Sequence, residues 1–192
     1  MPSPIGHALG GLAVAWVADL LPPRTSLASG EGPAHGRPEG LHYKSVYLCV
    51  ALAVLPDADL LLPIAHRTVT HSFAAVAAVA LLMIVAGSVT GKVTARFAVA
   101  CVAAYASHLL LDWLQIDRNP PSGIQLLWPF SSRWFISDFD LFRQTARQEF
   151  FTAPIIRQNA IAVAQECLIL LPILALIAYA RLRQHRQLRI RN

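Results

Sequence analysis

Residues 73–90 read FAAVAAVALLMIVAGSVT, a run without a single charged side chain. A helix needs about 20 apolar residues to cross the hydrocarbon core of a bilayer, and somewhat shorter runs are tolerated. This stretch therefore predicts a membrane-spanning helix. Further apolar runs lie on both sides of it, at residues 5–21, 45–64, 93–116 and 161–180. Together they predict an all-α fold, a polytopic membrane helical bundle of about four to five spanning helices.

The composition agrees with a lipid-facing surface. Hydrophobic residues make up 55% of the 192 residues and charged residues only 14%, whereas a soluble domain carries about 25% charged residues. The length fits one membrane-embedded domain over residues 1–192. The start, MPSPIGHALGG, lacks the basic region of a signal peptide, so we expect the first apolar run to stay in the protein.

Three segments differ from the spans. Residues 22–44 are rich in Pro, Gly and Ser and predict a flexible loop, in which His35 and His42 would be solvated. Residues 117–159 mix aromatic and charged side chains, as an interfacial cap segment does. Residues 181–192 form a basic tail of five arginines. Such a tail after an apolar run is typical of a cytoplasmic flank that meets anionic lipid headgroups, and no patch typical of nucleic-acid binding is present.

The basic residues also predict an orientation. If all five runs span the membrane, ten of the 16 Lys and Arg residues lie on the side of the basic tail. Cytoplasmic flanks carry an excess of these residues. We therefore predict a multi-pass protein of the inner (plasma) membrane with a cytoplasmic C-terminus.

With this topology, four separate stretches deliver His and Asp to the outer side. They are His7 at the start of the first span, Asp57 and Asp59 at the end of the second, His66 and His71 before the third, and His108 and Asp112 in the last turns of the fourth. Polar residues scattered at random would not all be expected on the same side. The agreement predicts one site at the outer face.

The local spacings suit metal ligands. His108 and Asp112 are four residues apart, so they share one helix face and can reach one metal, or Asp112 can orient His108. Pro56 favours an extended or turn backbone in Leu-Pro56-Asp57-Ala-Asp59. Alternate carboxylates can then point the same way, so that one bridges two cations while the other binds terminally.

The stretch from His66 to Ser72 carries two histidines and an arginine. Thr70 or Ser72 can cap the third helix, which would fix His71 at a helix start with His66 on the preceding loop. Arg67 is placed to meet an anion such as a substrate phosphate.

Each motif also has a purely structural interpretation. A lone membrane His is more often a hydrogen-bonded packing residue, Asp57 and Asp59 can end a helix, and His108 with Asp112 can be a buried hydrogen bond. Their joint occurrence favours a divalent cation, because ionisable groups at membrane depth are costly and few basic residues are near to neutralise them. Asp138 and Asp140 are expected to shape a turn.

Other catalytic signatures are missing from the sequence. It contains no GxSxG, P-loop, GxGxxG or HExxH motif. Glu166 in the fifth span is a weaker candidate that could support the site from behind, and we expect His185 in the basic tail to be solvated.

These motifs resemble the YdjM-type, LexA-regulated, membrane-bound metal-dependent hydrolases of bacteria. The resemblance rests on Pro-Ile-Gly-His7, Leu-Pro56-Asp57-Ala-Asp59, His66-Arg67-Thr-Val-Thr70-His71-Ser72, Ser107-His108-Leu-Leu-Leu-Asp112 and Gly123-Ile-Gln-Leu-Leu-Trp128-Pro129-Phe130. It implies a small multi-span inner-membrane protein with a metal-dependent hydrolase site. The pattern is also distantly similar to zinc-dependent phospholipases C, which cleave phosphoesters. Those enzymes use a free N-terminal residue as a ligand, and here the chain begins at Met1, so we expect two metals rather than three.

The function hypothesis is a hydrolase for a phosphoester of a lipid or a membrane-proximal substrate. His and carboxylate ligands suit Zn²⁺ best, with one or two ions, and Mn²⁺ or Fe²⁺ as alternatives. The expected metal ligands are His7, Asp57, His71, His108 and Asp112. Asp59 would bridge or act as the general base, His66 would bind metal or protonate the leaving group, and Arg67 would bind phosphate. The alternative is a non-catalytic metal carrier or sensor, which the one-sided polar residues disfavour.

Overall fold

The computed structural model describes residues 2–21, 43–62, 65–118, 120–146 and 149–191, with side chains up to residue 187. The predicted loop at residues 22–44, with His35 and His42, falls almost entirely outside this range. Within it the fold is all-helical, as predicted. The elements are α1 (Pro4–Leu20), α2 (Tyr43–Val54), η1 (Leu55–Leu61), η2 (Val69–His71), α3 (Phe73–Thr90), α4 (Ala95–Trp113) and α5 (Ala153–Arg191), where η marks 3₁₀ helices.

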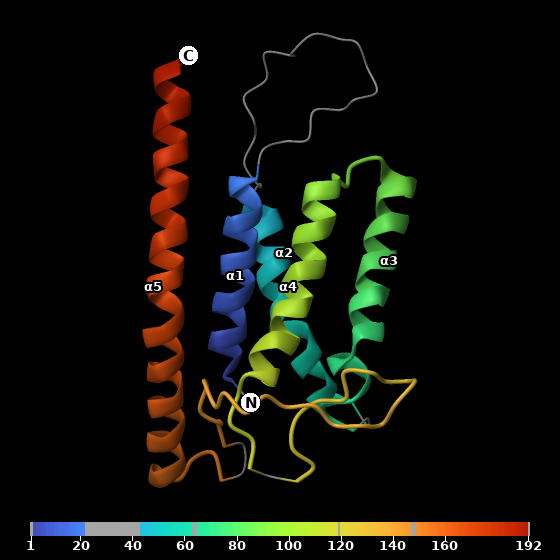
Figure 1. Cartoon of the computed structure of the whole chain (residues 1–192), viewed down its shortest axis with the longest axis vertical. Coiled ribbons are helices and arrows are strands. Elements are labelled where there is room, and N and C mark those ends of the chain that lie inside the picture. The colour runs from blue at the N-terminus through green and yellow to red at the C-terminus, as the bar shows by residue number, and fades with distance from the viewer. Residues whose placement is uncertain (1, 22–42, 63–64, 119, 147–148, 192) are drawn as a thin grey trace.

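The long helices run roughly side by side (Figure 1). α1 packs against α2, α4 and α5, and α4 also packs against α2 and α3. The start of α1, both 3₁₀ helices and the described residues between α4 and α5 lie at the lower end in Figure 1. The end of α1, the α3–α4 turn and the end of α5 lie at the upper end. The predicted convergence of distant stretches at one end is therefore found.

Three of the predicted spans agree closely with helices. α3 has the predicted bounds, α1 is shifted by one residue from the predicted 5–21, and α4 is slightly shorter than the predicted 93–116. α3, α4 and α5 are long and apolar enough to cross a membrane, and α1 is a shorter apolar helix. Large apolar side chains such as Leu82 and Leu168 are 67% and 75% exposed. Such exposure suits contact with lipid rather than water.

The second predicted span is wrong as a continuous membrane helix. In the predicted run 45–64, the α-helix ends at Val54 and the chain continues as the 3₁₀ helix η1. Pro56 explains the change, because proline has no N–H to donate and disfavours α-helical backbone in the residue before it. The result is a short α2 whose end brings two aspartates inside the bundle.

The last helix is longer than the predicted run 161–180. α5 begins at Ala153, continues through Pro172 and includes the basic residues up to Arg191. Two of its polar side chains bind α1. Glu166 meets Ser3 at the start of α1, and Arg181 meets Asp19 near its end.

The helices at the centre approach one another closely. The inner core consists of small residues from α1, α2 and α4: Ala15, Ala18, Cys49, Ala100, Cys101 and Ala104. Gly11 of α1 faces α2 so closely that a Cβ there would lie 2.6 Å from the Cβ of Ala53. Small residues permit such contacts between membrane helices. They bring the ends of α1, α2 and α4 within side-chain reach of one another.

Residues 114–118, 120–146 and 149–152 cross the lower end of the bundle without forming a long helix. Backbone hydrogen bonds hold this segment against the end of α4, from the Ser137 N–H to the Trp113 carbonyl (2.8 Å) and from the Leu141 N–H to the Leu114 carbonyl (2.9 Å). An antiparallel bridge joins Ile124 and Phe135. The segment thus covers the end of the bundle where the predicted site residues lie.

Candidate metal centre

The structure brings all seven predicted His and Asp residues together. These residues, called the His/Asp cluster below, are His7, Asp57, Asp59, His66, His71, His108 and Asp112. Their side chains come from α1, η1, the turn before η2, η2 itself and α4. His7, His71, His108 and Asp112 are fully buried. Every expected metal ligand therefore lies within one compact group.

Four donor atoms face one another inside this cluster. The Nε2 atoms of His71 and His108 lie 3.1 Å apart. Asp57 Oδ1 lies 3.7 Å from the first nitrogen and 3.6 Å from the second, and Asp112 Oδ2 lies 3.3 Å and 3.5 Å from them. Ligand atoms about 2.0–2.1 Å from a tetrahedral zinc ion lie roughly 3.3 Å apart. The distance between the two nitrogens and those from each oxygen to both nitrogens therefore suit ligands of one divalent ion.

A backbone carbonyl fixes the ring of His108. Its Nδ1 lies 2.7 Å from the carbonyl oxygen of Ala53 at the end of α2. A carbonyl can only accept, so Nδ1 carries the hydrogen and the Nε2 lone pair of the neutral ring faces the other donors. Metal-binding histidines are usually held by such a hydrogen bond from the second ring nitrogen.

His71 is oriented in the same way by side chains. The Thr70 hydroxyl donates to Asp59 Oδ2 (2.7 Å), so it accepts from His71 Nδ1, which lies 2.9 Å away. Asp59 Oδ2 itself lies 3.4 Å from the same nitrogen. The hydrogen of His71 is thereby kept on Nδ1, and Nε2 faces the four-donor group. Tyr105 supports this turn, because its hydroxyl donates to the Thr70 carbonyl (2.7 Å).

The two aspartates of η1 do not point the same way, which corrects the sequence interpretation. Asp57 reaches the Nε2 side of His71, whereas Asp59 reaches the Nδ1 side. The expectation assumed an extended backbone, in which alternate side chains share a face, but residues two apart on a 3₁₀ helix point in different directions. Asp57 thus belongs to the four-donor group, and Asp59 supports His71.

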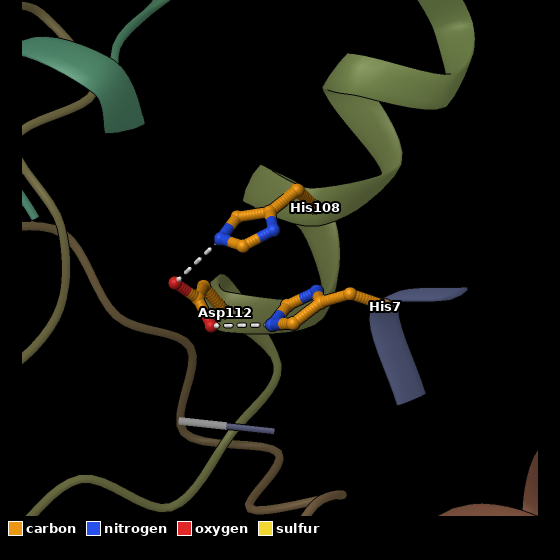
Figure 2. A group of neighbouring side chains, drawn as sticks. All are labelled: His7, His108 and Asp112. Atoms are coloured by element: carbon orange, nitrogen blue, oxygen red, sulfur yellow. Dashed lines mark ion pairs between the residues drawn. The ribbon is translucent and has the colours of Figure 1, made fainter. Parts of the chain in front are cut away.

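His7 extends the cluster to a second position. Its Nε2 lies 3.5 Å from Asp112 Oδ1, the oxygen that does not face His71. Figure 2 shows the rings of His7 and His108 side by side with Asp112 between their Nε2 atoms, and the ring centroids are 3.7 Å apart. Asp112 can therefore bridge two cation positions, one on each carboxylate oxygen.

The unsatisfied atoms test whether a cation fits. Among the described residues, both ring nitrogens of His7 and both carboxylate oxygens of Asp112 are buried and have no hydrogen-bond partner. Buried polar atoms are normally paired, and buried carboxylates need a counter-charge. A divalent ion between them would satisfy His7 Nε2 and supply the carboxylate's counter-charge, so the donor set fits a metal.

The electrostatics of η1 and η2 also favour a cation. Burial by itself lowers the pKa of His71, but the surrounding carboxylates of Asp112, Asp57 and Asp59 raise it to about 10. Burial likewise works against the charge of Asp59, yet His66, His71 and Thr70 hold the pKa of this carboxyl below its usual value. The negative potential that retains a proton on His71 would equally attract a metal ion.

His66 and Arg67 lie at the edge of the cluster. His66 Nδ1 lies 2.6 Å from Asp59 Oδ1, and its side chain is 23% exposed, so this ring is the most accessible of the four histidines in the cluster. The Arg67 guanidinium pairs with Asp117, and its backbone N–H donates to Asp59 (3.3 Å). Arg67 has a positive φ of 65°. Its anion-binding role stays a prediction, since Asp117 already holds this side chain.

Sequence reasoning missed one supporting group, Asp117, and ranked another, Glu166, among its weaker candidates. Asp117, which also accepts from the Gly123 N–H (2.9 Å), ties the residues after α4 to Arg67. Glu166 is fully buried and accepts from the Ser3 N–H (2.7 Å) and hydroxyl. It therefore supports the start of α1, one turn before His7, from behind, as the weaker expectation stated. No local motif marks these pairs, because their partners are distant in sequence.

The remaining polar candidates lie away from the cluster. Asp138, Asp140 and His185 are exposed. Asp140 has a positive φ of 48°, which suits a turn. None of the three contributes to the metal-ligand groups found among the described residues.

Comparison with known proteins agrees with this arrangement. The profile of the YdjM inner membrane protein family matches residues 1–186. Because the match covers almost the whole chain, the chain belongs to this family, and the predicted resemblance is confirmed. No curated protein and no solved structure matches the chain. The chain is thus an inner-membrane family member with buried His and Asp groups that can hold a metal ion.

Proposed function

We propose that this member of the YdjM family is a membrane-embedded metal-dependent hydrolase that cleaves a phosphoester of a lipid or a membrane-proximal substrate. The observation that carries the proposal is the four-donor group, in which two imidazole nitrogens lie 3.1 Å apart and each of two carboxylate oxygens lies 3.3–3.7 Å from both of them. His and carboxylate ligands suit Zn²⁺, with Mn²⁺ or Fe²⁺ as alternatives.

The side chains divide into ligands and orienting groups. His71, His108, Asp57 and Asp112 would hold one ion, and His7 with the second oxygen of Asp112 would hold another. When bound, such ions act as Lewis acids that activate water and stabilise charge on phosphoryl oxygens. The Ala53 carbonyl and the Asp59–Thr70 pair hold the Nδ1 sides of the two rings, so that both Nε2 atoms point inward.

Two residues at the edge would serve the substrate. His66 is partly exposed and held by Asp59, so it can donate a proton to a leaving group at the mouth of the site. Arg67 can offer its remaining guanidinium N–H groups to a phosphate, while Asp117 fixes its position. Asp59 is better placed to orient both histidines than to bridge two cations, because its oxygens contact His66 and Thr70.

The geometry supports a hydrolase over a metal carrier. A carrier needs ligands along a path across the membrane, but the described metal-ligand groups all lie at one end of the bundle. At the other end, the carboxylate of Asp19 is paired with Arg96 and Arg181. An acidic group already neutralised by two arginines is a poor relay for a cation.

The basic tail supports an orientation with the cluster on the outer side. The cluster and the end of α5 lie at opposite ends of the bundle (Figure 1). With the arginine-rich end in the cytoplasm, the site opens on the outer side of the inner membrane. A reporter enzyme that is active only outside the cytoplasm, fused after Asn192, should be inactive. An active fusion would show that the orientation is the reverse of the one proposed.

The decisive experiment combines metal analysis with hydrolysis. Detergent-purified protein should contain one to two equivalents of a divalent metal and should cleave bis(p-nitrophenyl) phosphate, with loss of activity on chelation and recovery on metal addition. His108→Ala should lose both metal and activity. The matched control is His185→Ala, which removes an exposed imidazole and should change neither. Full metal content in His108→Ala would refute the site, and metal flux into vesicles without hydrolysis would favour the carrier.

A further inference from the structure

A polar pocket opens at the same end of the molecule, outside the His/Asp cluster. It has a volume of about 530 Å³ and lies between the first turns of α5 and the segment that follows α4. Its charged and polar lining consists of Arg118, Arg143, Arg157, Gln144 and Gln158, with Ile116 and Ile161 as apolar walls. We call it the arginine pocket.

The arginine pocket has an unbalanced positive charge. Among the described residues, no acidic side chain lines the pocket, and none of its three arginines forms an ion pair. The nearest acid in sequence, Asp117, is held by Arg67, the Gly123 N–H and the side chain of Gln144. Guanidinium groups bind phosphate with paired, charge-assisted hydrogen bonds, so the pocket is complementary to a phosphate group.

The position of the pocket corresponds to the headgroup layer of a membrane. Arg157 lies one turn before Ile161, where the long apolar run of α5 begins. Basic residues at the end of a spanning helix meet lipid headgroups. A phosphate bound there would lie at the level at which lipid phosphates lie.

A shallow apolar groove, open to one side, continues along the same helix. It has a volume of about 630 Å³ and is lined by Ala164, Cys167, Leu168, Leu171, Pro172 and Ala175 of α5. These positions continue the three- and four-residue spacing of Arg157, Gln158 and Ile161, so pocket and groove lie along largely one face of α5. From Ile161 to Ala175 the helix rises about 21 Å, which exceeds the thickness of one leaflet of hydrocarbon, about 15 Å.

We propose that the arginine pocket and this groove together bind one anionic phospholipid, with its phosphate between Arg118, Arg143 and Arg157 and an acyl chain along α5. A charged pocket at headgroup level, followed by an apolar groove of acyl-chain length, matches both parts of such a lipid. The site is separate from the metal ligands and does not depend on the proposed hydrolysis.

The test uses the full chain in neutral detergent, with binding of short-chain lipids measured by native mass spectrometry. Dioctanoyl phosphatidylglycerol should bind at least about tenfold more tightly than dioctanoyl phosphatidylcholine. Arg157→Gln and Arg143→Gln should each weaken the anionic lipid about tenfold, because each removes charge-assisted hydrogen bonds. The matched control is Arg133→Gln, which removes an exposed arginine at the same end but outside the pocket and should have no effect.

Three results would overturn the proposal. If Arg133→Gln weakens binding of the anionic lipid equally, the effect is general charge attraction. If both pocket variants keep the affinity of the wild type, the arginine pocket is not the binding site. Inorganic phosphate or glycerol phosphate that competes as strongly as the lipid would make this a site for a soluble phosphate. His108→Ala should keep lipid binding, so a failure of the metal proposal can be told apart from a failure of this one.

Discussion

Buried carboxylates at the two ends of the bundle have different kinds of partner. At the end of α1, Asp19 accepts from Arg96 (2.9 Å) and from the Nε–H of Arg181 (3.1 Å). At the other end, the ion-pair partners of Asp112 are three histidines, each of which can be neutral. The first carboxylate has a permanent counter-charge within the protein. The second has none, and it can acquire one only by taking up protons or a metal ion.

The difference separates a structural polar site from a candidate metal site. An arginine stays charged at any ordinary pH and leaves a carboxylate no capacity for another cation. Imidazole can be neutral and can bind metal through a lone pair. The same helices, α1 and α4, contribute to both ends. It is therefore the identity of the partner, and not burial alone, that marks the lower end as the site.

The largest effect is expected for Asp112→Asn. This change keeps the shape of the side chain but removes the charge that both cation positions share. We expect bound metal to be lost and hydrolysis to fall roughly a thousandfold, since metal ions supply several kcal/mol of transition-state stabilisation. Elemental analysis and initial rates would measure this. If Asp112→Asn retains stoichiometric metal, the charge of Asp112 does not bind the metal, and Asp112 differs less from Asp19 than their partners suggest.

A smaller effect is expected for Asp59→Asn. Asp59 orients His71 and His66 without belonging to the four-donor group, and loss of such an orienting carboxylate typically weakens metal binding 10–100-fold. A competition titration with a chelator would measure the affinity. Asp140→Asn is the control, because Asp140 is exposed and has a positive φ that Asn tolerates. An unchanged affinity in Asp59→Asn would contradict the orienting role.

Metal affinity should also rise with pH. The carboxylates raise the pKa of His71 to about 10, so the metal-free protein holds a proton on this ring at neutral pH. A metal ion must displace that proton, so its affinity should increase about tenfold per pH unit and level off near the pKa. Calorimetry in buffers of different ionisation enthalpy would count the released proton. An affinity that is flat between pH 6 and 8 would mean that His71 is neutral without metal.

The smallest functional effect is expected at the opposite end. Asp19→Asn leaves Arg96 and Arg181 without their carboxylate, and we expect a loss of about 2 kcal/mol in the free energy of unfolding, below the range for fully buried pairs because the arginines are 19% and 24% exposed. Thermal unfolding in detergent would measure it. Metal content and activity should stay within about twofold of the wild type. A loss of metal in Asp19→Asn would show that the two ends are coupled.

Much of the helical pattern was predictable from local sequence. α3 has the predicted bounds because a capping residue lies at each end of its apolar run. Ser72 is the N-cap and accepts from the Ala75 N–H, and Gly91 adopts the left-handed C-cap conformation. The prediction of a second continuous span was wrong because hydropathy is averaged over many residues. The average does not register the missing N–H of Pro56. The membership of the cluster was predictable because consecutive apolar runs cross in alternate directions, which brings the ends that carry His and Asp to one end of the bundle.

The sequence by itself determined the helix-forming runs, the side to which each His and Asp belongs, and the chemical type of the ligands. These features follow from side-chain chemistry and from the alternating direction of consecutive spans. Only the tertiary structure decided which atoms face one another: that Asp57 and Asp59 flank opposite edges of His71, and that the Ala53 carbonyl fixes His108. Such contacts depend on how closely the helices pack and on where one helix ends, and neither is encoded in the spacing of residues within a single stretch.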